Sequence, residues 1–347
     1  MDISNYFKQA IEQKASDLHL VAGSIPALRI SGELIKLNHE VIKSKELEQA
    51  VNSLINKKIW ERFQRKRELD FSQEFFGNRF RINLHYQEGK IGLSARLVPS
   101  DVPKPEELGI NEVIYKLTHL RDGLILVTGP SGSGKSTTLA IMINIINIER
   151  RAHIITIEDP IEYLFKEKQS IIEQRELGHD TKDFALALKY TLRQDPNVIM
   201  VGEMRDKETI SAALTAAETG HLVLSTLHTT TAAETIERII DVFPSHQQQQ
   251  ILNQLASTLR AVIGQQLLPK VGGGRMAARE IMINNSAIAN LIRRNQIGQI
   301  YTVIQTSRKD GMITMNKAID KLLKEDLISA DVAKNYKRDM DTQSAYY

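Results

Sequence analysis

Residues 129–137 read GPSGSGKST and constrain the fold more than any other part of the chain. They match the phosphate-binding pattern G-x-x-x-x-G-K-[ST], in which glycines let the backbone wrap so that successive amide N–H groups point at a phosphate. The pattern is informative only between a strand and a helix. The apolar run at 124–128 and the helical apolar run after Gly134 meet this condition. We therefore predict an α/β domain built on a parallel sheet.

The loop is expected to bind the phosphates of ATP. Lys135 would supply a full positive charge to the β- and γ-phosphates, and the Ser136 hydroxyl would ligate Mg²⁺. The alternative is a glycine-rich turn without a ligand, which the flanking strand and helix disfavour. The predicted nucleotide-binding residues of the loop are Gly129, Pro130, Ser131, Gly132, Ser133, Gly134, Lys135, Ser136 and Thr137.

Carboxylates follow two of the predicted strands. The run NVIMVG leads to Glu203, and HIITI leads to the segment EDPIE, which ends at Glu162. The carboxyl ends of parallel strands meet at one edge of a sheet, beside the phosphate loop. We predict Glu203 as the main general base and a metal ligand, and Glu162 as a residue that positions the water or the metal. The alternative is that both carboxylates are solvated surface residues.

Two histidines bracket the apolar run HLVLSTLH. His228 ends this predicted strand at the edge where the ligand is expected, so we predict that it senses the γ-phosphate. His221 begins the strand, and two interpretations of it stay open. It is either a nucleotide-binding residue or a structural residue that forms hydrogen bonds within the fold.

Two arginines near the N-terminus are predicted to face each other. The run RFRINLHY alternates apolar and polar residues, which is typical of a strand with one buried face. A two-residue turn at Glu88-Gly89 would place Arg81 directly opposite Arg96. Like charges in this position repel unless an anion lies between them, and a triphosphate is the obvious anion. The alternative is an exposed basic face with both side chains in water.

Length and composition predict two domains. A chain of 347 residues is long for one domain, and Pro99, Pro103 and Pro105 break both helix and sheet. Short alternating runs before these prolines predict a mixed α+β domain, whereas apolar strands alternate with helices after them. The predicted boundaries are a domain at 1–98, a linker at 99–106, an ATPase domain at 107–284 and its C-terminal helical region at 285–347.

Composition also excludes several classes of site. The chain contains no cysteine, so it has no disulfide, no thiolate zinc site and no cysteine nucleophile. The longest apolar stretch, at 139–148, is shorter than the roughly 20 residues of a membrane span. The first residues are acidic and polar where a secretory signal needs a basic start, so we expect a cytoplasmic location. A net charge of +3 is little evidence for a nucleic-acid partner, and we expect none.

Five motifs in a fixed order carry a family resemblance. They are ASDLHL at 15–20, GPSGSGKST at 129–137, ITIEDPIEY at 155–163, VGEMRD at 201–206 and TGHLVLSTLHT at 219–229. On these motifs the chain resembles the secretion ATPases of the P-loop NTPases. Within them it is similar to the type IV pilus retraction ATPases over essentially its whole length.

The resemblance implies a homohexameric ring. In each subunit a smaller N-terminal PAS-like α+β domain is joined by a flexible linker to a RecA-like P-loop ATPase domain. ATP is implied to bind between these domains, with Arg81 and Arg96 closing over its phosphates. Family members also carry two catalytic arginines four residues apart before the strand that leads to Glu203. Here Arg193 matches the second, but Lys189 holds the first position and cannot form a bidentate contact.

The resemblance further implies a motor that retracts type IV pili and drives twitching motility. Its implied partners are a platform protein of the inner membrane and a paralogous retraction ATPase, and its implied place is the inner face of the cytoplasmic membrane. AIANLIRRNQIGQI at 287–300 resembles the retraction motif AIRNLIRE, with Ala289 and Arg294 as departures. A pilus assembly or type II secretion ATPase is the alternative, and a nucleic-acid translocase a third. Assembly ATPases usually carry an extra N-terminal domain and a four-cysteine insertion, and we expect neither here.

Overall fold

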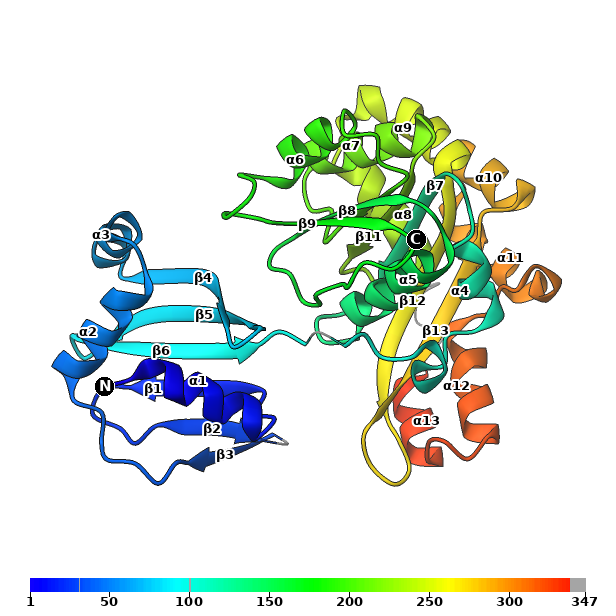
Figure 1. The fold of residues 1–347 in the computed structure, drawn as a ribbon. Helices are drawn as coiled ribbons and strands as arrows, with labels where there is room; N and C mark the ends of the chain where they lie inside the picture. The colour runs from blue at the N-terminus through cyan, green and yellow to red at the C-terminus, as the bar shows by residue number, and fades with distance from the viewer. Residues whose placement is uncertain (31, 100, 338–347) are drawn as a thin grey trace. The chain divides into compact units, whose positions relative to one another are not determined.

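The chain folds into two units in a computed structural model that describes residues 1–30, 32–99 and 101–337 (Figure 1). The first unit holds Met1–Asp101 and Glu162–Leu164, and the second holds Val102–Ile161 and Phe165–Tyr347. Ser100 of the predicted linker and residues 338–347 of the predicted C-terminal region lie outside the described residues.

The first unit is an antiparallel sheet with three helices. Within its described residues six strands pair in the order β3-β2-β1-β6-β5-β4, and each neighbouring pair is antiparallel. The strands are β1 (Asp17–Val21), β2 (Ala27–Ile30), β3 (Glu33–Lys36), β4 (Glu68–Phe75), β5 (Asn78–Gln87) and β6 (Lys90–Leu97). The helices are α1 (Ile3–Glu12), α2 (Ser44–Leu54) and α3 (Lys57–Lys66).

One face of this sheet forms the core of the first unit. Phe7 of α1 stacks on Phe75 with ring centroids 3.7 Å apart and meets Phe80 edge-on at 4.9 Å. Alternate residues of the strands point to the opposite, more polar face. Arg81 pairs with Arg96 across β5 and β6, and Gln87 pairs with Lys90 beside the turn. The predicted register of the two arginines is therefore confirmed.

The second unit is built on a mostly parallel sheet. In the described residues seven strands pair in the order β13-β12-β7-β11-β10-β8-β9, and only β12 and β13 run antiparallel to each other. They are β7 (Gly123–Thr128), β8 (His153–Glu158), β9 (Ile171–Glu176), β10 (Val198–Val201), β11 (Leu222–Leu227), β12 (Leu259–Pro269) and β13 (Arg275–Ile283). All residues of β7, β10 and β11 are buried, because helices cover both faces.

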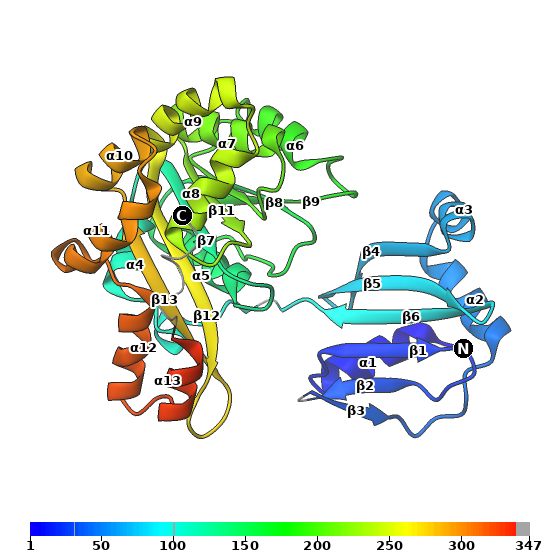
Figure 2. The same ribbon diagram turned by 180° about the vertical axis from the view of Figure 1, so that it is seen from behind.

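The helices divide between the two faces of this sheet (Figures 1 and 2). The core on one face contains side chains of α4 (Glu112–Leu117) and α5 (Lys135–Glu149). The core on the other face contains α6 (Phe184–Thr191), α7 (Lys207–Glu218), α8 (Ala232–Asp241), α9 (Ser245–Thr258), α10 (Ser286–Arg293) and α11 (Ile300–Thr306). The predicted α/β class, with a parallel sheet covered on both faces, is therefore confirmed.

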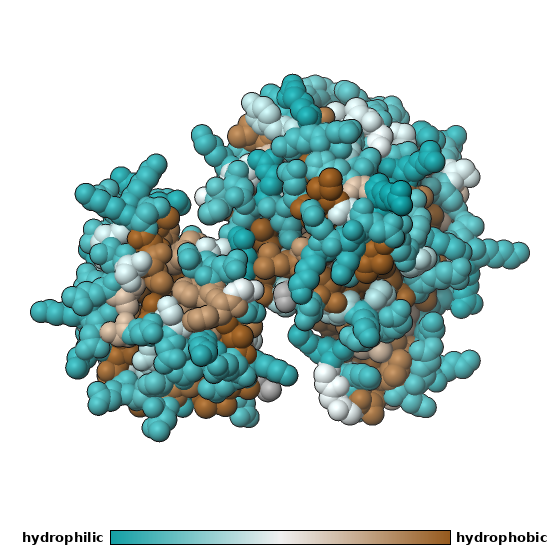
Figure 3. All heavy atoms as spheres, viewed as in Figure 1, coloured by the Kyte–Doolittle hydropathy of each residue, from teal (hydrophilic) through white to brown (hydrophobic). Residues whose placement is uncertain are grey.

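A smaller cluster extends the second unit along the β12–β13 hairpin. Leu268 of β12 and Ala278 of β13 pack with Ile319 of α12 (Met315–Lys324) and Ala333 of α13 (Ala330–Tyr336). Hydrophilic residues cover most of the second unit's surface in the view of Figure 3. Among the described residues, no helix has the length and apolar character needed to cross a membrane.

The β12–β13 hairpin supports the phosphate loop through a buried amide. Gln265 of β12 donates from Nε2 to the carbonyl oxygen of Ser133 at 2.6 Å. Its Oε1 accepts from Thr138 Oγ1 and from Arg279 Nε, both at 2.8 Å. Gln265 and Thr138 are at most 2% exposed, so water does not compete for these bonds. The loop conformation is therefore fixed from the sheet side.

Arg279 of β13 connects this amide to the start of the second unit. Its Nη1 donates to the carbonyl oxygens of Leu108 and Gly109 at 2.9 and 3.0 Å, just after the short helix η1 (Pro105–Leu108). Every hydrogen-bond partner of Arg279 in the described residues is a neutral oxygen. Burial lowers the pKa of Arg279 to about 10, so the side chain is still charged at neutral pH.

Replacing Arg279 with Met should lower the free energy of unfolding by roughly 2–4 kcal/mol. The substitution keeps an unbranched side chain but leaves the carbonyls of Leu108 and Gly109 without their donor. Urea denaturation of the full chain measures the loss. Arg275→Met is the matched control, because Arg275 is exposed at the start of the same strand and should change stability by less than about 0.5 kcal/mol. Equal losses in the two variants would contradict the assigned support role.

Candidate active site

Three segments singled out in the sequence follow neighbouring strand ends. The phosphate loop follows β7, His228 follows β11 and Glu203 lies two residues after β10. Thr128 pairs with Leu227, and Val201 pairs with Ser225, so the three strands end at the same edge. The predicted placement of these segments at one edge is confirmed, while the role of each residue stays a prediction.

The phosphate loop can follow its path only with glycine at two positions. Gly129 has φ 145°, and a Cβ there would collide with the backbone oxygen of Gln265. Gly134 has φ 85° and caps α5, and a Cβ on it would lie 2.9 Å from Gln265 Nε2. Both positions therefore need a residue without a side chain. This explains why the hairpin can approach the loop so closely.

The loop residues fit a bound anion. Lys135 is buried, and its Nζ donates to the carbonyl oxygens of Gly129 and Pro130 at 2.8 and 3.0 Å. The hydroxyls of Thr128 and Ser133 are buried without a hydrogen-bond partner in the described part of the chain. The N-terminus of α5 and the Lys135 ammonium together form the kind of site that binds an anion.

The predicted metal donors are oxygen atoms, which suits magnesium. Residues 1–30, 32–99 and 101–337 contain no group of three or more His, Asp or Glu side chains able to hold a metal ion. Mg²⁺ is commonly bound through one or two protein ligands together with substrate phosphates and water. The predicted protein ligands are the Ser136 hydroxyl and the carboxylates of Glu203 and Glu162, all oxygen donors of the kind that Mg²⁺ takes.

The structure brings Glu203 and His228 together. Nε2 of His228 lies 3.3 Å from Oε2 of Glu203, and Nε of Arg205 lies 2.7 Å from Oε1. Glu203 is 19% exposed at its side chain, whereas Arg205 is 71% exposed. Arg205 was missed from the sequence, although a cation two residues after a predicted base was a usable signal. Each carboxylate oxygen therefore has a neighbour that restrains its orientation.

A buried carboxylate on the neighbouring strand was also missed. Glu158 ends β8, is 6% exposed, and accepts from Thr156 Oγ1 at 2.6 Å and from Gln174 Nε2 at 3.3 Å. Because Ile157 pairs with Val201, this end of β8 lies beside the end of β10. Glu162, the carboxylate predicted for this segment, is exposed four residues farther along the chain. Glu158 is the first residue of the EDPIE segment, so the motif itself contained the signal.

Two predicted residues are not brought to this chain's own phosphate loop. His221 precedes β11 at its amino end, the opposite end from His228, and its Nδ1 lies 2.9 Å from the carbonyl oxygen of Ala216. These contacts favour the interpretation of His221 as a structural residue, and its role in nucleotide binding stays a prediction. Arg193 also precedes its strand, β10, and its guanidinium lies 5.9 Å from the ring centroid of Tyr190.

The facing arginines of the first unit have a third charge beside them. Arg81 and Arg96 are both exposed on the polar face of the sheet. Asp17 of β1 pairs with Arg96 on its other side, and its Oδ1 lies 2.7 Å from Arg96 Nε. The expected repulsion between the two arginines is therefore partly offset by a carboxylate. No sequence pattern pointed to this contact, because the two residues lie far apart in the chain.

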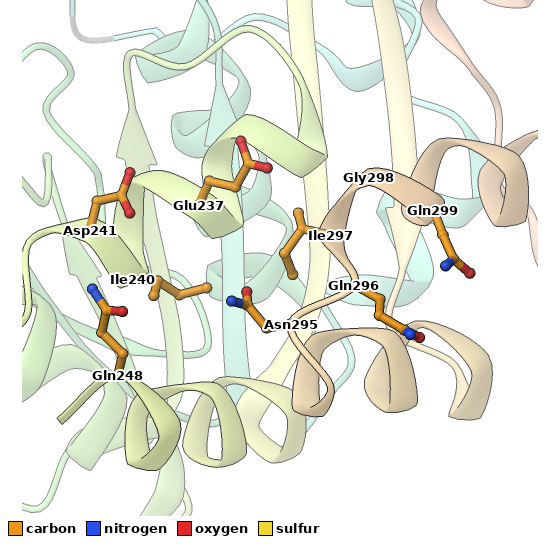
Figure 4. A pocket seen from close by; sticks show the side chains of 9 residues that line it. All are labelled: Glu237, Ile240, Asp241, Gln248, Asn295, Gln296, Ile297, Gly298 and Gln299. Atoms are coloured by element: carbon orange, nitrogen blue, oxygen red, sulfur yellow. The ribbon is translucent and has the colours of Figure 1, made fainter. Parts of the chain in front are cut away.

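A separate pocket of about 560 Å³ lies beside the C-terminal end of α8 (Figure 4). Glu237 and Asp241 supply its acidic wall, and burial together with Asp241 and Glu234 raises the pKa of Glu237. The opposite wall is the segment 295–299, which continues from α10. None of the residues predicted to bind nucleotide lines this pocket.

Comparison with known proteins gives consistent matches. Residues 106–273 match the profile of the family described as type II/IV secretion system protein. The chain is 46% identical to the type IV pilus retraction ATPase PilT of Pseudomonas aeruginosa, over 96% of this chain and 97% of that protein. It is 45% identical to a twitching motility protein of Neisseria gonorrhoeae, over 93% and 87% of the two chains.

A solved structure supports the same assignment. The crystal structure of the pilus retraction motor PilT with bound ADP superposes with a TM-score of 0.92 at 47% identity, covering 99% of this chain and 98% of that one. Similarity of this extent includes both units, the phosphate loop and the strand ends around Glu203. The chain therefore belongs to the secretion ATPase superfamily, in the group that contains the retraction ATPase PilT.

Proposed function

We propose that this protein is a homohexameric, ATP-hydrolysing motor that retracts type IV pili. The observation that carries the proposal is the phosphate loop, with Lys135 at the start of α5, at the sheet edge that also holds the Glu203–His228 pair. A parallel sheet with these groups at the carboxyl ends of its strands is suited to phosphoryl transfer to water. The extensive similarity to PilT supports pilus retraction as the task.

Binding of ATP would begin at the phosphate loop. Lys135 would exchange its contacts with the Gly129 and Pro130 carbonyls for phosphate oxygens, which bind a cation more strongly. Ser136 and Glu203 would hold Mg²⁺, which neutralises charge on the β- and γ-phosphates. Arg81 and Arg96 of the first unit would contact the same triphosphate, since a guanidinium fork matches phosphate oxygens.

Glu203 would then orient the attacking water and accept its proton on a carboxylate oxygen. Its contacts with Arg205 and His228 hold the carboxylate in one orientation, which keeps the acceptor in line for the reaction. A change at the γ-phosphate would alter the hydrogen bond between His228 and Glu203, and His228 would report hydrolysis in this way. Glu162 would assist in positioning the water or the metal.

Partners and location follow the same proposal. The motor would work at the cytoplasmic face of the inner membrane, against a platform protein that anchors the pilus, and a paralogous retraction ATPase would act beside it. Its sequence contains no cysteine and so lacks the four-cysteine insertion usual in assembly ATPases. This absence favours retraction over assembly.

α10 is the element proposed to couple hydrolysis to the pilus. Ile288, Leu291 and Ile292 are buried in the core of the second unit, while Asn290 and Arg293 are exposed. Ala289, at a position where the retraction motif carries arginine, is also buried, so an arginine there would need a different environment. The exposed side of α10 is available to a partner.

Glu203→Gln should bind ATP but hydrolyse it at least 100-fold more slowly, because the amide keeps the shape and loses the base. Phosphate release by the purified hexamer measures turnover, and a fluorescent ATP analogue measures binding. Glu208→Gln, an exposed carboxylate in the first turn of α7, is the control and should hydrolyse ATP normally. Wild-type turnover by Glu203→Gln would assign the base role to another carboxylate, such as Glu158 or Glu162.

A double substitution on α10 should separate hydrolysis from retraction. Asn290→Ala with Arg293→Ala should leave hexamers that hydrolyse ATP at close to the wild-type rate in cells that have lost twitching motility. Lys321→Ala with Lys324→Ala, at exposed positions of α12, is the control for removing two polar side chains from a solvent-facing helix. If turnover and twitching fall together, α10 supports the active site; if neither changes, it has no coupling role.

A further inference from the structure

The motif ASDLHL at 15–20 has no part in the chemistry proposed above. Most of it forms β1, where the side chains alternate between the two faces of the sheet. Leu18 and Leu20 are fully buried in the core of the first unit. Asp17 and His19 lie on the opposite face, the one that also carries Arg81 and Arg96. Asp17 is the buried carboxylate in the cross-strand row that contains Arg96 and Arg81.

The carboxylate of Asp17 is held at both oxygens. Oδ1 accepts from Arg96 Nε at 2.7 Å, and Oδ2 accepts from the Ser16 hydroxyl at 2.8 Å. Asp17 is 8% exposed. Burial alone would raise the pKa of Asp17, but the hydrogen bonds from Arg96 and Ser16 outweigh it and hold the pKa below its ordinary value. Asp17 is therefore ionised at neutral pH and fixed in position.

Asp17 contacts one particular nitrogen of the Arg96 guanidinium. Its contact with Arg96 is through Nε, and the two terminal nitrogens of Arg96 have no hydrogen-bond partner in the residues that the structure describes. The side chain of Arg96 is 71% exposed. A guanidinium is planar, so fixing Nε also restricts the direction of the terminal pair that binds phosphate oxygens. The ion pair thus orients Arg96 without using its phosphate-binding fork.

Asp17 lies between two arginines in the sheet but forms its ion pair with Arg96. Arg96 of β6 pairs with it on one side, and Arg29 of β2 pairs with it on the other. Arg29 donates from Nη1 to the carbonyl oxygen of Gly32 at 2.9 Å and forms no ion pair with Asp17 in the described residues. Arg96 in turn pairs with Arg81 of β5, so these residues form one row across the sheet. The single carboxylate of this row therefore acts on the arginine that faces Arg81.

We propose that Asp17 is a positioning residue for Arg96 in ATP hydrolysis. By holding Nε, Asp17 presents the two terminal nitrogens of Arg96 to the phosphates and lowers the repulsion between Arg96 and Arg81 before ATP binds. The inference rests on the proposed function, in which Arg96 contacts the triphosphate. The ASDLHL motif would then contribute to catalysis through Asp17, which positions Arg96.

Steady-state hydrolysis by the full-length hexamer tests this. Asp17→Ala should lower kcat roughly 10- to 100-fold, the cost expected when a catalytic group is misplaced by about 1 Å. Asp70→Ala is the matched control, because Asp70 lies on the same sheet but hydrogen-bonds the neutral amide of Asn83 at 3.2 Å. Its kcat should stay close to wild type. Thermal melting of both variants checks that the hexamers are folded.

The residue at position 96 should change the effect of Asp17→Ala. In an Arg96→Ala background, Asp17→Ala should cause no further loss, because Asp17 acts through Arg96. In an Arg96→Lys background, Asp17→Ala should raise kcat, since Asp17 would otherwise hold the only charged group of the lysine. A purely structural role for Asp17 would lower kcat by the same factor in every background, and that result would overturn the proposal.

The failure of this inference differs from failure of the proposed function. If Arg96→Ala hydrolyses ATP at the wild-type rate, Arg96 has no role in hydrolysis, and the inference falls with that part of the proposed function. If Arg96→Ala is slow while Asp17→Ala keeps wild-type kcat, the proposed function stands and only the role of Asp17 is refuted. The two outcomes are read from the same set of purified hexamers.

Discussion

The phosphate loop is the constraint on which the rest of the second unit depends. Its amide N–H groups can face a phosphate only if its carbonyl groups turn away and find donors elsewhere. Gln265 supplies such a donor to the Ser133 carbonyl. Gln265 is itself held by Arg279 across the β12–β13 pair. The edge hairpin, far from the loop in sequence, is thus part of the nucleotide site.

The same network gives the loop a physical connection to the start of the second unit. Arg279 holds the carbonyls of Leu108 and Gly109 with one end and Gln265 with the other. Asp17 has a comparable role in the first unit, where it restrains Arg96. In both units a buried polar side chain fixes a group proposed to bind phosphate, so the precision of the site depends on residues that do not themselves touch ATP.

Local patterns predicted the parts of the structure that depend on local geometry. The glycine spacing located the phosphate loop, and alternation with a two-residue turn gave the pairing of Arg81 with Arg96. Gln265 and Arg279 could not be found this way, because Gln265 lies 132 positions from its partner Ser133. His221 shows a further limit. The sequence places it at the start of its strand, but only the structure shows its Nδ1 2.9 Å from the carbonyl oxygen of Ala216.

The central claim is that hydrolysis at the phosphate loop powers pilus retraction. The direct measurement is to replace the gene with a Lys135→Ala version and then count surface pili and film their retraction in living cells. Loss of the loop lysine removes its charge from the phosphate site. The account predicts cells covered with pili that extend and never retract. Bald cells, or pili that retract at the normal frequency, would contradict it.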